Sequence, residues 1–319
     1  MKQKILKTRK LLPAILVALY MTLSLTGCGS NKVSAGSGKD KVKIAYLPIT
    51  HSLAVLEEAE ELKVSADSNI DVELVKYGSW PELLDALNSG QVDGASVLIE
   101  LAMKSKSEGV GIKAVALGHK DGNVIIVSND VKDGADLKGR TIAIPHRQSS
   151  HNILVNLALE KNGLTINDIN VVELAPTEMP SALAAGTIDG YCVAEPFGAM
   201  GVSIGAGKVL YESNELWEDS ACCALVLTDK FVEERPEVAK KYVDAYKTAG
   251  SKLSSEEAKN VAKEYLNQKD DVLDISLQWI SYDDLDITEE LYSSLIEKVK
   301  AYGLSDNPPT YEDFVLNDF

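Results

Sequence analysis

Short apolar runs and amphipathic stretches follow each other along this chain, a pattern typical of an α/β protein. The stretch 171–197 illustrates it: a strand leads into a short helix beginning near Thr177-Glu178, and Gly186 stands where a helix end needs a positive φ. The apolar run 188–193 is too short for a helix and predicts a strand covered on both faces. It ends at AEPF, residues 194–197, where polar groups would emerge at the carboxyl edge of a sheet. Open α/β sheets bind ligands at that edge.

A second copy of this pattern predicts two lobes. The sequence Ala-Leu-x-x-Gly-x-Val/Ile-Asp-Gly occurs at 86–94 and again at 182–190. A separation of about a hundred residues is too long for a solenoid repeat, and it suits one copy in each of two α/β lobes. A chance match over the nine positions is the alternative.

The other elements follow from the same periodicities. Strands are predicted at 42–47, 72–77, 94–98, 112–117 and 122–128, the last as a crossover into the second lobe. Polar loops at 48–52 and 146–152 lead into helices at 53–62 and 153–161, and 224–227 is the predicted return crossover. The pattern from 236 to 302 is almost wholly helical and would pack on the first lobe. We therefore expect lobe one at 41–126 and 226–319, and lobe two at 127–225.

The first thirty residues have the pattern of an export signal. Positive residues precede the apolar segment 11–25, and Leu25-Thr26-Gly27-Cys28 follows. This end resembles the bacterial lipobox, which implies cleavage before Cys28 and lipidation of its thiol. The alternatives are an uncleaved membrane helix, for which fifteen apolar residues are short, and an ordinary signal peptide. We predict a signal peptide at 1–27, a lipidated Cys28 with a flexible tether at 28–40, and a lipid-anchored position on the extracytoplasmic face of the cell membrane.

Charge and cysteine content exclude several classes of protein. The 319 residues include 32 Lys+Arg and 48 Asp+Glu, and losing the five positive charges of the signal would change the net charge from −16 to −21. That balance argues against nucleic-acid binding. Beyond Cys28 the chain has Cys192, expected to be a small buried hydrophobe, and the neighbours Cys222 and Cys223. The last two are expected to be buried thiols, with a strained vicinal disulfide as the alternative. No Cys/His spacing indicates a metal site, and no cofactor is predicted.

Five segments together resemble the substrate-binding proteins of nitrate/sulfonate/taurine-type ABC importers. They are LPITHSLAV (47–55), YGSWPELLDALNSGQVDGASV (77–97), DGNVIIVSN (121–129), DLKGRTIAIPHRQSSHNILVNLALEKNGL (136–164) and LAAGTIDGYCVAEPF (183–197). The similarity covers about residues 41–228, and the segments 149–152 and 189–196 look closest to the nitrate and bicarbonate branch. The resemblance implies a two-lobed type II periplasmic-binding fold with a helical C-terminal region, a ligand between the lobes and closure by hinge motion.

The resemblance also implies ligand contacts. By its motifs, an oxyanion would be held by Trp80, Asn123 and His151. A further lysine is expected near Cys222 and Cys223, but no lysine lies between residues 208 and 230. Because a buried anion needs a compensating cation, this departure favours a larger organic ligand or a zwitterion over nitrate or bicarbonate.

Further candidates are polar residues in loops or at strand ends. They are Thr50, His51, Ser96, Arg147, Ser149 and Glu195. Each has a structural alternative: Trp80 as a core aromatic, His151 as a capping or surface residue, Asn123 and Glu195 as partners of the backbone, and Arg147 with His146 as part of a solvated loop. His119, beside Lys120-Asp121, is expected at the surface.

The chain offers no Ser/His/Asp set, phosphate loop or zinc spacing, so we predict a binding protein and not an enzyme. The predicted function is a lipid-anchored, monomeric solute-binding protein that delivers a small molecule (an anion, a sulfonate or a pyrimidine-like compound) to an ABC permease. One alternative is a lipoprotein that senses the ligand for a membrane kinase. The other is an enzyme similar to those that make the thiamine pyrimidine on this fold, whose cysteine-rich motif Cys222-Cys223 does not reproduce.

Overall fold

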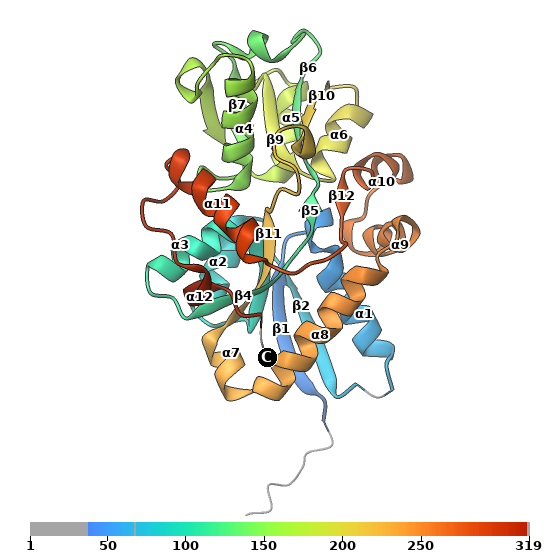
Figure 1. Ribbon diagram of the computed structural model, residues 1–319. Helices are drawn as coiled ribbons and strands as arrows, with labels where there is room; N and C mark the ends of the chain where they lie inside the picture. The colour runs from blue at the N-terminus through green and yellow to red at the C-terminus, as the bar shows by residue number, and fades with distance from the viewer. Residues whose placement is uncertain (1–37, 67, 318–319) are drawn as a thin grey trace, which may run out of the picture. The chain divides into compact units, whose positions relative to one another are not determined.

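Two five-stranded mixed sheets give the α/β framework in this computed structural model, which describes residues 38–66 and 68–317 (Figure 1). Lobe one has the strand order β2-β1-β3-β11-β4 and contains β1 (Asp40–Tyr46), β2 (Ile70–Lys76), β3 (Gly94–Leu98), β4 (Ile112–Leu117) and β11 (Cys223–Thr228). Lobe two has the order β10-β6-β9-β7-β8 and contains β6 (Asn123–Ser128), β7 (Thr141–Ile144), β8 (Asn170–Glu173), β9 (Gly190–Ala194) and β10 (Gly207–Glu212). The predicted signal peptide and Cys28 lie outside the described residues.

The two sheets repeat one topology. In lobe one β1 lies between β2 and β3 and is parallel to both, and in lobe two β7 has the same relation to β8 and β9. The strand that enters from the other lobe, β11 or β6, pairs antiparallel with β3 or β9. Within the described residues, each sheet therefore has four strands that run in one direction and a single strand, β11 or β6, that runs against them.

The sequence repeat has the same role in both lobes. The carboxylate of Asp93 accepts the Lys43 N–H at 2.9 Å, and its own N–H donates to the Lys43 carbonyl at 2.8 Å. Asp189 repeats both bonds with Thr141, each at 2.8 Å. This aspartate thus joins the start of the third parallel strand of each lobe to the neighbouring first strand.

The glycine after the helix of the repeat has a positive φ in both copies, as predicted for Gly186. Gly90 follows α2 with φ +69°, and Gly186 follows α5 with φ +67°. The glycine four residues later serves packing, because a Cβ at Gly190 would lie 2.7 Å from the Ile126 carbonyl oxygen. The repeat therefore encodes both a helix end and a close approach between strands.

Helices cover both sheets (Figure 1). Those between the strands are α1 (Leu53–Val64), α2 (Trp80–Asn88), α3 (Ile99–Ser107), α4 (Ser150–Lys161), α5 (Met179–Ala184) and α6 (Phe197–Ser203). The C-terminal region adds α7 (Asp229–Glu234), α8 (Pro236–Lys252), α9 (Ser255–Leu266), α10 (Asp270–Ser276), α11 (Glu289–Ala301) and α12 (Tyr311–Phe314). No helix among these described residues has the length and apolar composition required to cross a membrane.

The C-terminal helices close the side of lobe one. Both α8 and α9 pack on α1, and Leu53 and Leu56 of α1 join Ala262 of α9 and Leu273 of α10 in a buried apolar cluster. The region was predicted to be almost wholly helical, but it also contains β12 (Ile280–Ser281), which pairs with β5 (Lys120–Asp121). In addition α10 contacts α6, so the region touches lobe two as well.

The chain passes between the sheets twice. The first crossing lies between Leu117 and Asn123, and the second between Glu212 and Cys223. Both come a few residues before the lobe boundaries expected at 126/127 and 225/226. The reason is that β6 pairs only with strands of lobe two and β11 only with strands of lobe one, so the crossings are loop segments on either side of them.

Candidate functional site

Polar side chains meet where the carboxyl ends of the parallel strands of the two lobes face each other. Thr50 follows β1 of lobe one, and Glu195 follows β9 of lobe two. Both the backbone N–H and the hydroxyl of Thr50 donate to the Glu195 carbonyl, at 2.8 and 3.0 Å. Burial raises the pKa of the Glu100 carboxyl, after β3, and the backbone N–H of Ser150 in α4 lowers it. The two strand edges are therefore in contact.

The structure buries nearly all the residues that the sequence singled out for ligand contact. The buried ones are Thr50, His51, Trp80, Ser96, Asn123, Ser149, His151 and Glu195, and none of them is more than 2% exposed. Polar groups in such positions need partners, because burying one without a hydrogen bond costs about 1–3 kcal/mol.

Six of the buried side chains near this junction have polar atoms without such a partner among the described residues, and two of them are Glu100, through both carboxyl oxygens, and His119, through Nδ1. In the described part of the chain, no group bonds Trp80 Nε1, Asn123 Nδ2, Ser150 Oγ or either ring nitrogen of His151. Trp80 begins α2 of lobe one, and the other three belong to the start of β6 and α4 in lobe two. We call these four residues the polar set. A ligand with hydrogen-bonding groups would satisfy atoms from both lobes at once.

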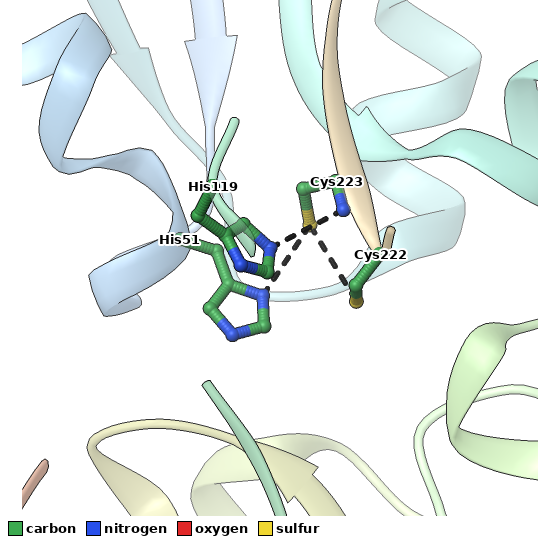
Figure 2. Close-up of side chains that lie close together, drawn as sticks. All are labelled: His51, His119, Cys222 and Cys223. Atoms are coloured by element: carbon green, nitrogen blue, oxygen red, sulfur yellow. Dashed lines mark hydrogen bonds between the residues drawn. The ribbon is translucent and has the colours of Figure 1, made fainter. Parts of the chain in front are cut away.

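A second group of side chains adjoins the polar set. Figure 2 shows His51 and His119 with Cys222 and Cys223, and one nitrogen or sulfur from each lies within 4.8 Å of the others. We call these four residues the His/Cys cluster. Both thiols are free, as expected, with 4.0 Å between the sulfur atoms. Cys222 Sγ also lies 3.8 Å from Asn123 Oδ1, which connects the cluster to the polar set.

Burial sets the charge of this region. It lowers the pKa of both His119 and His151 to about 4, so both imidazoles are neutral at neutral pH. It raises the pKa of Glu195 to about 8, against the opposing N–H of Ala199. It also raises the pKa of Glu100 well above its usual range. At neutral pH, desolvation therefore keeps these four groups largely uncharged.

Three predicted residues have other partners. Arg147 is exposed and its guanidinium donates to the Val171 carbonyl at 2.7 Å, so it lies apart from the buried candidates for ligand contact. Ser149 donates its hydroxyl to the His146 carbonyl at 2.6 Å. The Glu195 carboxyl accepts the Ala199 N–H at 3.0 Å, so it bonds the backbone at the start of α6.

The expectation that His119 lies at the surface was wrong. Its side chain is fully buried and stacks on His51, with ring centroids 3.5 Å apart. The exposed-looking neighbours Lys120-Asp121 form the short β5, while His119 turns inward at the first crossing. Sequence reasoning also missed Ser150, Cys222 and Cys223 as members of this region. The signals for the cysteines were their position directly before the predicted return strand and the ligand-contacting lysine that the family resemblance places near them.

Two α/β lobes of this topology, joined by two crossings and with polar groups at the junction, make up the type II periplasmic-binding-protein fold. The chain belongs to the NMT1-like family, whose model matches residues 35–267. It is 40% identical to the ligand binding component of an ABC-type import system from Staphylococcus aureus, a structure with zinc bound. That similarity has a TM-score of 0.85 and covers 88% of this chain and 97% of the other.

More distant relatives share the fold or part of the sequence. The periplasmic nitrate-binding protein NrtA from Synechocystis shares the fold, with a TM-score of 0.75 at 18% identity over 84% of this chain and 83% of that one. A putative aliphatic sulfonates-binding protein of Bacillus subtilis is 27% identical over 74% of this chain and 72% of that protein. The chain spans only 31% to 50% of the length of several curated relatives named for nitrate and bicarbonate transport.

These comparisons confirm the resemblance to substrate-binding proteins of nitrate/sulfonate/taurine-type importers. The named S. aureus, Synechocystis and B. subtilis relatives are all binding proteins, which agrees with the prediction that this chain is not an enzyme.

Proposed function

We propose that this chain is the lipid-anchored solute-binding component of an ABC importer and acts on the extracytoplasmic face of the membrane. The observation that carries the proposal is the polar set, whose buried and unpartnered atoms come from both lobes. A solute bonding Trp80 from one side and His151 from the other would favour the closed arrangement of the lobes. The membership of the family and the 40% identical import component support this role.

The charge of the site argues for a solute without net negative charge. The buried polar and charged residues of the described chain include no lysine or arginine. His119 and His151 are neutral at neutral pH, and Arg147 is directed elsewhere. Nitrate or a sulfonate, the solutes for which relatives are named, would be buried here without a compensating cation. A neutral or cationic small polar molecule fits these residues better.

The anchor is proposed from the sequence. The segment Leu25-Thr26-Gly27-Cys28 resembles a lipobox, and Gly, Ser and Lys residues follow it. A lipid on Cys28 would keep the binding protein close to a membrane permease.

The test is a thermal-shift screen of the full chain in detergent, with a metal chelator present. The panel contains nitrate, bicarbonate, taurine, an alkanesulfonate, a thiamine pyrimidine, riboflavin, and small neutral and cationic amines. A bound solute stabilises the folded protein, by about 2.7 kcal/mol at a hundredfold its dissociation constant, so the unfolding temperature rises. We expect a neutral or cationic member of the panel to raise it.

Three variants locate the site. We expect Trp80→Ala and His151→Ala each to weaken binding of that solute at least tenfold, because each removes a donor or acceptor of the polar set. Arg147→Ala is the matched control and should bind as the wild type does, since its side chain is exposed. Wild-type affinity in both polar-set variants would contradict the site, and stabilisation by anions alone would contradict the proposed charge of the solute.

A further inference from the structure

We propose that His51, His119, Cys222 and Cys223 form a binding site for a thiophilic transition-metal ion of the zinc type. The site goes beyond the proposed function, since none of these residues belongs to the polar set. Their four side chains are fully buried, and they come from the loop after β1, from the first crossing and from the end of the second crossing. A metal held there would join both crossings to lobe one.

The distances within the cluster match a tetrahedral zinc site. Zinc binds cysteine sulfur at about 2.3 Å and histidine nitrogen at about 2.0–2.1 Å, which places two sulfurs about 3.8 Å apart and a sulfur and a nitrogen about 3.6 Å apart. The two sulfurs of Cys222 and Cys223 are 4.0 Å apart, and Cys223 Sγ lies 3.6 Å from His51 Nδ1. Both of these distances are therefore close to the required spacing, and all four donors lie within 4.8 Å of one another.

His51 is held by the bond that metal-binding histidines commonly make. Its Nε2–H donates to the Gly122 carbonyl at 3.0 Å, and this fixes the proton on Nε2. The lone pair of Nδ1 is then left on the side of Cys223 Sγ, as Figure 2 shows. The carbonyl that orients the His51 ring thus belongs to the first crossing.

Of the four donors, His119 has the orientation that suits metal binding least. Its Nε2 accepts the Cys223 N–H at 3.3 Å, its Nδ1 has no partner among the described residues, and its ring is stacked on that of His51 with only 29° between the planes. Nearly parallel rings cannot direct their lone pairs at one ion, so the His119 ring must turn to bind. We therefore expect His119 to contribute less to affinity than His51.

The charge balance favours this class of ion. Binding a divalent ion would release the two thiol protons to solvent, with no change of oxidation state, and two thiolates neutralise its charge. The resulting centre has no net charge. This suits the interior of the protein, because none of the buried residues in the described part of the chain is a lysine or an arginine. Two sulfur and two nitrogen donors select zinc-type ions over magnesium or calcium, which bind oxygen.

The experiment uses the full chain, reduced, stripped of metal and kept in detergent. Co²⁺ is added first, because thiolate ligation to Co²⁺ gives a charge-transfer band that surface carboxylates do not give. Zn²⁺ affinity is then measured by competition with a chromophoric chelator. We expect one ion per chain, a thiolate band, and displacement of Co²⁺ by Zn²⁺. Absence of the band in the wild type would overturn the proposal without reference to any variant.

Matched cysteine variants assign the ligands. Cys222→Ala and Cys223→Ala should each weaken Zn²⁺ binding at least a hundredfold, and His51→Ala should weaken it more than His119→Ala does. Cys192→Ala, which removes the buried thiol of β9, should leave binding unchanged. Circular dichroism checks that each variant is folded. Wild-type Zn²⁺ affinity in both the Cys222 and the Cys223 variant would assign the ion to surface acids and overturn the site.

The solute site and the metal site are tested independently of each other. The solute screen contains a chelator and no metal, whereas the metal titration contains no solute. A chain that binds a solute through Trp80 and His151 but gives no thiolate band would overturn the metal site and leave the importer role intact.

Discussion

At the lobe junction, burial sets the protonation of individual side chains. Glu195 is fully buried at the end of β9, and desolvation raises the pKa of its carboxyl to about 8. The sequence predicted that this residue either faces a ligand or bonds the backbone. Its carboxyl accepts the Ala199 N–H, so this hydrogen bond contributes to the stability of lobe two.

This buried carboxyl makes stability depend on pH. Glu195 ionises near 4.5 in the unfolded chain and near 8 in the folded protein, so between these values the folded state holds one more proton. Its contribution to the free energy of unfolding is therefore complete below about pH 4.5 and is lost as the pH rises, by about 1.4 kcal/mol per pH unit up to about pH 8.

Glu195→Gln should flatten that dependence, because the amide stays neutral and keeps an oxygen to accept the Ala199 N–H. Urea denaturation at both ends of this pH range measures it. Glu234→Gln, at an exposed carboxyl of α7, is the control and should retain the wild-type slope. An unchanged slope in the Glu195 variant would mean that the carboxyl is ionised in the folded protein.

At the level of elements, the repeated unit ends a helix and begins a strand in each lobe. Gly186 has φ +67°, and a Cβ built there meets no atom within 4 Å. Backbone conformation alone therefore demands the glycine at this position, whereas at Gly190 the close approach of β6 demands it.

Gly186→Val should lower the free energy of unfolding by about 1–3 kcal/mol, because a β-branched residue is strained at positive φ. Gly186→Asn should cost less, since asparagine tolerates this region, and it fits the open space equally well. Chemical denaturation compares the two. An equal loss in both variants would indicate a cause other than backbone strain.

At the level of the whole molecule, the proposed lipid anchor at Cys28 would hold the binding protein at the membrane surface. The described residues form a framework of two sheets, and the proposed lipid attachment at Cys28 precedes it in the chain.

Cys28→Ser should abolish incorporation of a labelled fatty acid and move the protein from the membrane fraction to the soluble fraction, because the hydroxyl does not replace the thiol in lipidation. Metabolic labelling and cell fractionation of the full chain measure this. Cys192→Ser should keep both the label and the membrane location. Label retained in the Cys28 variant would place the anchor elsewhere.

The sequence by itself determined the framework of this protein. Local periodicity predicted the strands, the paired lobes and the helical C-terminal region, and the turn glycine Gly186 has the positive φ expected of it. Family motifs also led to Trp80, Asn123 and His151, all of which are buried. These features were accessible because each depends on residues close together in the chain.

Only the tertiary structure decided which polar residues meet. His119 contacts Cys223 across 104 positions, and His51 contacts it across 172. No local spacing encodes such contacts, because they arise where two crossings and the loop after β1 converge at the edge of a sheet. The same packing leaves Arg147 exposed and bonded to the Val171 carbonyl, a position between whose two alternatives the sequence could not choose. The periodicity of a chain specifies which face of each element is buried, but the neighbours of a side chain in a loop depend on how the sheets are joined.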